Sequence, residues 1–383
     1  MESSKKNIVL IGPAHPLRGG LASYNERLAR EFIKEGFDVT IYTFSLQYPG
    51  FLFPGTTQFS SEPPPTDLRI KKVINSINPL NWIKIGIQIK KSKPDLVIVR
   101  YWLPFMGPCL GTILRIIKKN QHSKVVCIAD NIIPHEKRFG DKAFTQYFVK
   151  PIDGFITMSQ KVLNDLSIFS KNTSAKYVPH PLYDNFGEKI DQSQARQKIN
   201  IDSKQPIVLF FGFIRKYKGL DLLFEAISIL KKSKTFNQEI KFLIAGEFYE
   251  DQKIYDNLIA DLGIEDKLIL RTDFISDSEV KYYMCASDLV IQPYKNATQS
   301  GVTPLAYHFE IPMIVTNVGG LPDLVPDNKV GLVAEPNSNS IAEKIESYFN
   351  IGKQNFIPGL LNEKKKYSWS VMVSEILNLV SKS

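Results

Sequence analysis

The 383-residue sequence contains few cysteines and no long hydrophobic run, and both absences restrict what the protein can be. Its three cysteines, Cys109, Cys127 and Cys285, are far apart and form no Cys-x-x-Cys pair, so they provide neither a disulfide framework nor a zinc site. No uncharged apolar segment approaches the roughly 18 residues of a membrane-spanning helix. The short polar stretch before Ile8 lacks the features of a secretory signal. We therefore expect a cytoplasmic protein.

Two common nucleotide-binding motifs are also absent. The sequence has no Gly-x-Gly, which argues against a dinucleotide-dependent oxidoreductase. It has no Gly-x4-Gly-Lys-Ser/Thr either, which argues against a P-loop nucleotidase. No recognisable nucleic-acid-binding module accompanies the net charge of +9, so we expect no nucleic-acid partner.

The positive charge is concentrated in the first half of the chain. Residues 1–182 carry 25 Lys and Arg against 13 Asp and Glu, whereas residues 183–383 carry 23 against 26. The excess is greatest from Arg69 to Lys93, where seven basic residues occur without an acidic one and Trp82 and several isoleucines lie among them. Such a stretch suits an anionic membrane surface, such as the inner membrane face. A solvated face of the domain explains it equally well.

Strand-like and helix-like segments alternate along both halves, which predicts an α/β protein with two doubly wound parallel sheets. In the first half we expect strands at 7–11, 39–43, 96–99, 124–128 and 155–158, a short sixth candidate at 177–178, and a helix at 21–34. In the second half we expect strands at 207–211, 241–245, 268–271, 289–292, 313–316 and 331–333. The segment 83–89 alternates like a strand. Apolar residues become sparse between Tyr183 and Gln205, which we take as the linker.

The most informative segment of the second half is 207–220. An apolar strand ends at Gly212, and a helical pattern begins at Leu220. Between them lie Arg215, Lys216 and Lys218, at the carboxyl end of a strand, where open α/β sheets bind ligands. A cationic loop beside a helix start suits a phosphate, although a solvated turn with ordinary lysines would look the same.

A second segment, 289–303, repeats this plan. A short strand leads into a polar loop, and Gly301 opens a helix-like segment over 302–309. Thr298, Gln299 and Ser300 lie where that helix would begin, so short polar side chains and free backbone N–H groups would meet there. The second half therefore offers several phosphate-binding strand ends in a row.

With these segments and several others, the chain resembles a retaining glycosyltransferase of family 4, the glycosyl transferases group 1. The matching segments of the second half are FGFIRKYKGLDLLFEA, FLIAGE, FISDSEVKYYMCASDLVIQPY, TQSGV, EIPMIVTNVGGLPDLV and GLVAEPNS. Those of the first half are GPAHPLRGGLASYNERLAREF, DNIIPHEKR, GFITMSQKVLNDL and YVPHPLYDNF. They span nearly the whole chain in the family's order and are specific for the fold and the general chemistry, not for the sugar.

The resemblance implies the GT-B fold, in which two Rossmann-like domains face a central cleft. We expect an acceptor-side domain at 1–182, a donor domain at 183–366 and a terminal helix at 367–383. In the family that helix crosses back to the N-terminal domain; a capping helix on the second domain is the alternative. The family also places a helix at 83–89, and we leave helix and strand open there.

The resemblance further implies sugar transfer from a nucleotide donor, such as a UDP- or GDP-sugar, to a glycan or lipid-linked acceptor in cell-surface polysaccharide synthesis. The residues expected to bind the donor are Gly19, Gly20, Gly212, Arg215, Lys218, Ile275, Thr298, Gln299, Ser300, Gly301, Val302 and Thr303. Arg215 and Lys218 would neutralise the diphosphate as negative charge develops on the leaving oxygen. Gly20 would let the backbone of the first domain approach the same phosphates.

Asp130 and His135 are the further catalytic candidates, because they follow the fourth expected strand of the first domain, where the family often has a histidine beside the donor sugar. The chain has no Asp-x-Asp, the usual metal–diphosphate clamp of the other major glycosyltransferase fold. We therefore expect a metal-independent hexosyltransferase without a cofactor. The retaining, front-face mechanism is expected from the resemblance alone.

Two departures from the family concern the donor site. The family usually has two glutamates separated by seven residues, and these positions hold Ala297 and Leu305 here. Phe213 occupies the place of the family's arginine after the strand glycine, and Arg215 lies two residues further on. Two other interpretations therefore stay open: an epimerase of the same fold acting on a nucleotide sugar, and a non-catalytic protein that binds nucleotide sugars.

Overall fold

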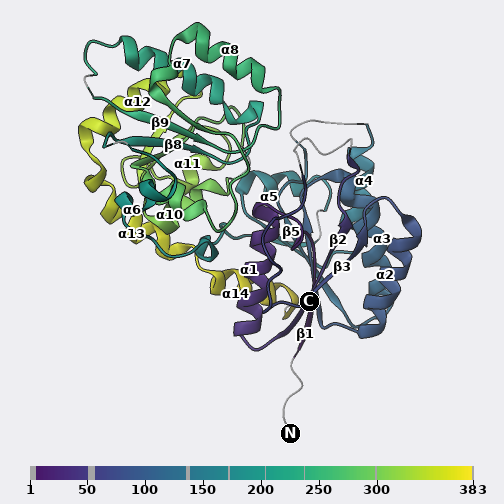
Figure 1. Ribbon diagram of the computed structural model, residues 1–383. Helices are drawn as coiled ribbons and strands as arrows, with labels where there is room; N and C mark the ends of the chain where they lie inside the picture. Colours follow the sequence, from purple (N-terminus) through teal and green to yellow (C-terminus); the bar gives the residue numbers. More distant parts are fainter. Residues whose placement is uncertain are drawn as a thin grey trace. The chain divides into compact units, whose positions relative to one another are not determined.

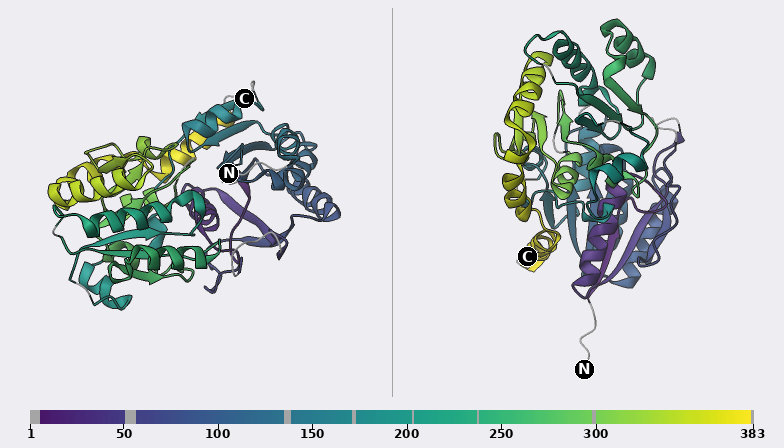
Figure 2. Two further views of the ribbon diagram at one scale, coloured as in Figure 1. Left: turned by 90° about the horizontal axis from the view of Figure 1, so that it is seen from above. Right: turned by 60° about the vertical axis from the view of Figure 1, so that its left-hand side comes forward.

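The computed structural model describes residues 6–50, 57–134, 139–170, 173–202, 204–236, 238–297 and 300–381 (Figure 1). The chain divides into two compact units, one formed by 1–181 with 368–383 and the other by 182–367. Each unit contains one parallel sheet with helices on both faces, as Figures 1 and 2 show.

The sheet of the first unit has seven parallel strands in the order β3-β2-β1-β4-β5-β6-β7. The strands are β1 (Asn7–Ile11), β2 (Asp38–Leu46), β3 (Ile70–Asn75), β4 (Leu96–Tyr101), β5 (Lys124–Ala129), β6 (Gly154–Thr157) and β7 (Ser174–Tyr177). The central strands are buried on both faces, as a parallel sheet requires, and their side chains form the core of this unit. The strand order reverses between β1 and β4.

Two groups of helices cover this sheet. They are α1 (Gly20–Lys34), α2 (Pro79–Ser92), α3 (Gly107–Lys118), α4 (Asp141–Val149), α5 (Gln160–Leu166) and α14 (Trp369–Ser381). Helices α2, α3 and α4 pack side by side on one face (Figure 1). The terminal helix α14 packs on α1 and on strands β5, β6 and β7, so this last segment of the chain belongs to the first unit.

The second unit repeats the architecture with six parallel strands in the order β10-β9-β8-β11-β12-β13. The strands are β8 (Ile207–Phe211), β9 (Lys241–Ala245), β10 (Leu268–Arg271), β11 (Leu289–Gln292), β12 (Met313–Thr316) and β13 (Gly331–Ala334). The helices are α6 (Gln192–Lys198), α7 (Leu220–Lys232), α8 (Gln252–Leu262), α9 (Val280–Ala286), α10 (Val302–Phe309), α11 (Leu321–Leu324), α12 (Ser338–Ile351) and α13 (Ile357–Glu363). Here the order reverses between β8 and β11.

The structure confirms the predicted fold class, two doubly wound parallel sheets, and differs from the sequence analysis in detail. Strand β3 was not predicted, because its sequence IKKVIN places two lysines on an exposed edge. Residues 83–89 form part of helix α2, not a strand. The expected linker contains helix α6, which packs on α9 within the second unit. No helix in the described ranges is both long enough and apolar enough to span a bilayer.

Candidate functional site

The carboxyl edge of the second sheet brings two loops together at the point where the strand order reverses. One loop follows β8 and the other follows its neighbour β11. Open α/β sheets bind ligands in the crevice at such a reversal, because the loops on either side of it diverge. The loop after β8 contains Arg215 and Lys218, and the loop after β11 leads to Ser300 and helix α10.

Two glycines let these loops approach each other. Gly219 has φ +68° and precedes α7; a Cβ there would lie 2.0 Å from the carbonyl oxygen of Pro293 in the loop after β11. Gly212 has φ +93°, and a Cβ there would lie 3.1 Å from Nζ of Lys218 and 4.0 Å from Cγ2 of Val302. A left-handed backbone and close approach both exclude larger residues at these positions. Gly212, Lys218 and the start of α10 therefore lie in one place.

Lys218 is the residue on which the site depends. Its side chain is 9% exposed, and its ammonium lies 5.7 Å from the ring centre of Tyr294. None of the ion pairs between the described residues involves Lys218. Burial, and to a smaller extent the charge of Arg215, lowers the pKa of Lys218 to about 7. A buried ammonium without a carboxylate is costly, and an anionic ligand would offset that cost.

Arg215 places a second cation beside Lys218. It is exposed, and its guanidinium carbon lies 4.9 Å from the ring centre of Tyr249, a cation–π contact. Its carbonyl oxygen accepts a hydrogen bond from the backbone N–H of Lys218 at 2.8 Å. Tyr249 also packs against Phe213, with ring centres 4.4 Å apart. The aromatic residue found in place of the family arginine thus supports the ring that holds Arg215.

The start of helix α10 is arranged differently from the sequence-based expectation. Ser300 is buried, and its Oγ accepts the N–H of Val302 at 3.1 Å and lies 3.3 Å from the hydroxyl of Tyr294. The N–H of Val302 is therefore already satisfied by Ser300. Thr303 is buried and exchanges hydrogen bonds with the side chain of Gln292, so it fixes α10 to β11. Four expected donor-binding residues lie in succession here, from Ser300 to Thr303, and only Gly301 among them is exposed.

Of the other expected residues of the second unit, one lies at the carboxyl edge of the sheet and two lie outside the described residues. Ile275 is half-buried in the loop after β10, next to Phe274, whose ring stacks 6.1 Å from that of Phe213. Thr298 and Gln299 lie outside the described residues. Ala297 and Leu305, which stand where the family has glutamates, are both buried, so no carboxylate is provided from these positions.

Sequence analysis did not identify Glu247, Tyr249 or Tyr294 as site residues. Glu247 follows β9 and is 5% exposed, and its carbonyl oxygen accepts the N–H of Ile214 at 2.8 Å, directly beside Arg215. The sequence contained a signal for Glu247, because in FLIAGE a glutamate follows directly after an apolar strand. Its nearness to Arg215 could not be found from the sequence, because 32 residues separate the two in the chain.

In the first unit, the expected residues lie on different elements of the sheet edge. Gly19, with φ +97°, precedes helix α1, whose first residue is the exposed Gly20. Both oxygens of Asp130 accept hydrogen bonds from Arg100 at 2.6 Å, and both side chains are buried. His135 lies outside the described residues.

The Arg100–Asp130 pair belongs to a buried polar group. The guanidinium of Arg100 lies 3.9 Å from the ring centre of Tyr24, which packs edge-on against His180. Burial lowers the pKa of His180 to about 3, the charge of Arg100 adds to this effect, and Nδ1 of His180 lies 2.6 Å from the carbonyl oxygen of Pro181. His180 is therefore a neutral, structural histidine. The prediction that Asp130 acts on the substrate stays a prediction, and its carboxylate is already engaged by Arg100.

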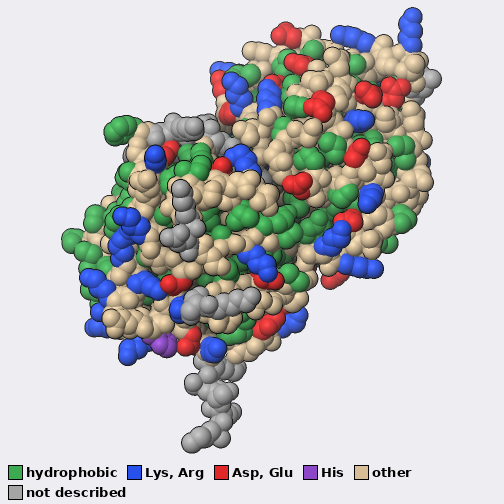
Figure 3. All heavy atoms as spheres, turned by 180° about the vertical axis from the view of Figure 1, so that it is seen from behind, with side chains coloured by type: hydrophobic (Ala, Val, Ile, Leu, Met, Phe, Trp, Pro, Cys, Tyr) green, Lys and Arg blue, Asp and Glu red, His purple; other side chains and the backbone are tan. Residues whose placement is uncertain are grey.

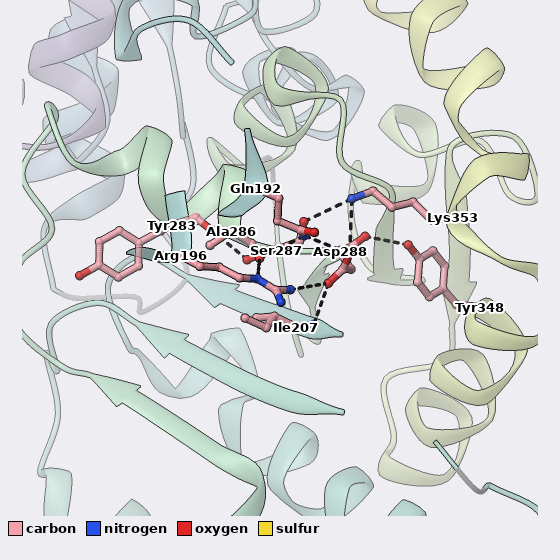
Figure 4. Close-up of polar contacts among 9 residues, drawn as sticks. All are labelled: Gln192, Arg196, Ile207, Tyr283, Ala286, Ser287, Asp288, Tyr348 and Lys353. Atoms are coloured by element: carbon pink, nitrogen blue, oxygen red, sulfur yellow. Dashed lines mark hydrogen bonds and ion pairs between the residues drawn. The ribbon is translucent and has the colours of Figure 1, made fainter. Parts of the chain in front are cut away.

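The opposite, amino edge of the second sheet has a polar cluster of another kind. Asp288 precedes β11 and accepts hydrogen bonds from Gln192 at 3.1 Å, Arg196 at 3.0 Å and the N–H of Ile207 at 2.9 Å. The ammonium of Lys353 lies 3.6 Å from the same carboxylate. Figure 4 shows these side chains directed towards Asp288. Every charge here has an opposite charge beside it, so the cluster joins α6, the start of β8 and the turn after α12 to the start of β11.

Comparison with known proteins agrees with this arrangement. Two family models match: Glycosyltransferase Family 4 over residues 18–173 and Glycosyl transferases group 1 over residues 191–356. A D-inositol 3-phosphate glycosyltransferase of Corynebacterium aurimucosum is 24% identical over 49% of this chain and 45% of its own length. An uncharacterized glycosyltransferase of Methanocaldococcus jannaschii is 26% identical over 77% of both chains. An uncharacterized 41.2 kDa protein from the cps region of Klebsiella pneumoniae is 24% identical over 42% of both chains, so the chain spans less than half the length of this relative and of the Corynebacterium one.

Solved structures show the same fold. Sucrose-phosphate synthase from Thermosynechococcus elongatus matches with a TM-score of 0.75, 16% identity and 99% coverage of both chains. Anabaena HepE in complex with UDP-glucose matches with a TM-score of 0.73 and 14% identity, over 98% of this chain and all of that one. The family models together account for most of the chain, one in each half. The chain therefore belongs to the glycosyl transferases group 1 of glycosyltransferase family 4 and has their GT-B fold.

Proposed function

We propose that the protein transfers a sugar from a nucleotide-sugar donor to a glycan or lipid-linked acceptor. The observation that carries this proposal is the buried ammonium of Lys218, which has no carboxylate partner among the described residues and lies at the strand-order reversal of the second sheet. A donor diphosphate would provide the missing negative charge. That Anabaena HepE was solved with UDP and with UDP-glucose supports a UDP-sugar as the first donor to test.

The chemistry that this site can perform follows from its charges. Breaking the bond between the sugar and the diphosphate places negative charge on the leaving oxygen, and fixed cations stabilise that charge in the transition state. Lys218 and Arg215 would do this on the second unit, with the exposed Gly301 beside them. In the retaining, front-face mechanism that we propose, the acceptor hydroxyl attacks the sugar carbon on the side of the departing diphosphate and passes its proton to it.

The experiment compares Lys218→Ala with Lys232→Ala in binding of UDP and in transfer from UDP-sugars. Lys232 is an exposed lysine in the last turn of α7, so its removal changes the net charge equally. Loss of Lys218 should weaken UDP binding about 10- to 100-fold, because a charged hydrogen bond contributes about 1.5–3 kcal/mol. It should lower turnover about 100- to 1000-fold. Equal binding and turnover in a folded Lys218→Ala protein and in the control would contradict the assignment.

We also propose that the reaction needs no metal ion, because the side chains of Arg215 and Lys218 would provide the positive charge that a metal ion supplies beside a diphosphate. No group of three or more His, Cys, Asp or Glu side chains in the described part of the chain is arranged to hold a metal. Transfer should therefore continue in EDTA. Loss of transfer in EDTA and its recovery on addition of Mg²⁺ would refute this part of the proposal.

A non-catalytic nucleotide-sugar-binding protein is the second candidate, and one observation favours it. Ala297 and Leu305 are apolar and buried where the family has two glutamates, so contacts to sugar and ribose hydroxyl groups are missing there. Measurements of UDP binding and of transfer from UDP-sugars separate the two candidates. Tight UDP binding without turnover on any acceptor or in hydrolysis would select the binding protein, whereas a new sugar still attached to the nucleotide would select an epimerase.

A further inference from the structure

Helix α2 of the first unit exposes an unusual number of large aliphatic side chains. Leu80 is 77% exposed, Ile83 44% and Ile87 42%. Positions 80, 83 and 87 follow the spacing that places residues on one stripe of a helix. The opposite side of the helix is buried, with Ile85 and Ile89 in the core of the unit. The exposed stripe is therefore not the core-facing side of α2.

Positive charge lies directly beside this stripe. Lys84 and Lys91 are exposed and, by helical spacing, lie next to it on the outward side. None of the ion pairs between described residues involves these lysines or the neighbouring Lys90 and Lys93. Helix α2 lies at the right-hand side of Figure 1, which becomes the left-hand side in the reversed view of Figure 3. There, Lys and Arg side chains lie among hydrophobic ones.

The structure also shows which residues of 69–93 do not contribute to this face. Arg69 pairs with Asp38, and Lys71 lies over the ring of Tyr42 and contacts its hydroxyl at 3.3 Å. Trp82 packs against the core and donates Nε1–H to the carbonyl oxygen of Asn75 at 2.7 Å. The sequence had grouped these residues with the α2 lysines. Because these residues already have partners elsewhere in the unit, we do not count them in the face described below.

We propose that the outward face of α2, formed by Leu80, Ile83, Lys84, Ile87 and Lys91, docks onto an anionic lipid surface. An amphipathic helix lies parallel to such a surface, with its aliphatic side chains among the acyl-chain boundary and its lysines at the headgroups. Both halves of this chemistry are present on one helix face, and no acidic residue occurs from 69 to 93 to oppose it. A second copy of the chain fits less well, because a two-fold interface would place lysines against lysines.

This inference concerns a face of the first unit and does not depend on Lys218 or on the proposed reaction. The test is sedimentation of the full-length protein with vesicles of phosphatidylcholine containing 30% phosphatidylglycerol, and with pure phosphatidylcholine vesicles. Binding should require the anionic lipid and should weaken as salt is raised, since surface charges are screened within about 8 Å at physiological ionic strength. Equal binding to both vesicle types, or to neither, would overturn the proposal.

Two pairs of variants separate the charge from the apolar side chains. Lys84→Gln with Lys91→Gln should lower the partition coefficient about 30-fold, because each basic residue near an anionic surface contributes about fivefold. Ile83→Ser with Ile87→Ser should lower it more than tenfold. All four positions are exposed, so the melting temperature should not change. UDP binding should also stay unchanged, which keeps the outcome distinct from failure of the proposed function.

Matched controls lie on the second unit. Ile254→Ser removes an isoleucine that is 62% exposed on α8, and Lys232→Gln removes an exposed lysine on α7. Neither control should change vesicle binding. If the α2 variants bind vesicles as well as the unaltered protein does, the proposal is wrong. If they instead abolish a dimer seen by light scattering, the face is a contact between copies of this chain.

Discussion

The two edges of the second sheet use their charged side chains in opposite ways. At the amino edge, the carboxylate of Asp288 is surrounded by Arg196, Lys353 and the amide of Gln192, and the charges compensate each other within the protein (Figure 4). At the carboxyl edge, Lys218 and Arg215 lie together, and no ion pair among the described residues includes either. The charges of the amino-edge cluster are therefore compensated within the protein, whereas those of the candidate site are not.

The difference also appears in the pKa values. Burial lowers the pKa of Lys353, but the nearby carboxylate of Asp288 opposes the effect. Burial lowers the pKa of Lys218 to about 7, and the nearest charge, Arg215, adds to the effect. Placing a buried ammonium beside a second cation lowers the stability of the folded protein, so we interpret this arrangement as a site for an anion.

Breaking the amino-edge cluster should give the largest effect. Asp288→Ala leaves Arg196 and Lys353 without their carboxylate and removes the acceptor for the N–H of Ile207. We expect unfolding free energy to fall by about 3 kcal/mol, at the lower end of the cost of breaking a buried ion pair, because these side chains are partly exposed. Urea denaturation measures it. UDP binding by the folded fraction should stay the same; a large loss of affinity would show that the cluster also serves the site.

The pH dependence of donor binding tests the carboxyl edge. Lys218 loses its charge as pH rises through about 7 in the free protein, and a bound diphosphate would hold the proton. Affinity for UDP-glucose, whose phosphates do not titrate in this range, should therefore fall up to about tenfold from pH 7 to pH 8. Calorimetry in buffers of different ionisation enthalpy should show proton uptake on binding. A flat profile between pH 6 and pH 8 would contradict the low pKa of Lys218.

Removing the charge of Lys218 while keeping its length should separate stability from function. The folded-state pKa of Lys218 lies below its unfolded value of 10.5, so below about pH 10 the unfolded chain binds the proton more tightly. Lys218→Met should therefore raise the melting temperature at pH 7, by about 2–4 °C if the gain is about 1 kcal/mol. The gain should shrink as pH approaches 10. A lower melting temperature at pH 7 would mean that an unrecognised anionic partner compensates Lys218.

The smallest expected effect concerns the ring beneath Arg215. Tyr249→Leu removes the cation–π contact of the Arg215 guanidinium, which contributes about 0.5–1 kcal/mol at an exposed site. UDP affinity should fall about two- to fivefold, and Tyr249→Phe should restore it because the ring is kept. If Tyr249→Phe behaves like Tyr249→Leu, the hydroxyl of Tyr249 matters and the ring does not.

Much of the fold was accessible from the sequence for a simple reason. Central parallel strands are buried on both faces, so they appear as short continuous apolar runs, and the bounds predicted for β1 and β8 match the structure. The reason fails at an edge. Strand β3 lies at the edge of the sheet, and the adjacent Lys71 and Lys72 are both exposed although they point to opposite faces, so the strand has no apolar run to recognise.

Helix α2 shows a different limit. Isoleucine occupies alternate positions from 83 to 89, which is the pattern of a strand. In the structure Ile85 and Ile89 are buried, whereas Ile83 and Ile87 are exposed on the other side of a helix. The pattern misled because the exposed positions are apolar too. The same two residues that confused the secondary-structure prediction form the proposed lipid-binding face.

At the candidate site, local sequence was enough to select the loop 212–219, because a strand, a glycine and three basic residues occur in succession. It was not enough for Ser300, whose hydroxyl is used by the N–H of Val302 and the hydroxyl of Tyr294. Nor was it enough for Asp130, whose partner Arg100 lies 30 residues away on the neighbouring strand.

The sequence by itself determined the order of most strands and helices, the position of the basic loop and the absence of an acidic residue from 69 to 93. These are local properties, because they follow from the spacing of apolar residues in each segment and from the other side chains that the segment carries. Only the tertiary structure decided which charges are compensated. Compensation depends on distance between segments that are far apart in the chain, and the sheet order places Asp288 among cations while it leaves Lys218 beside another cation.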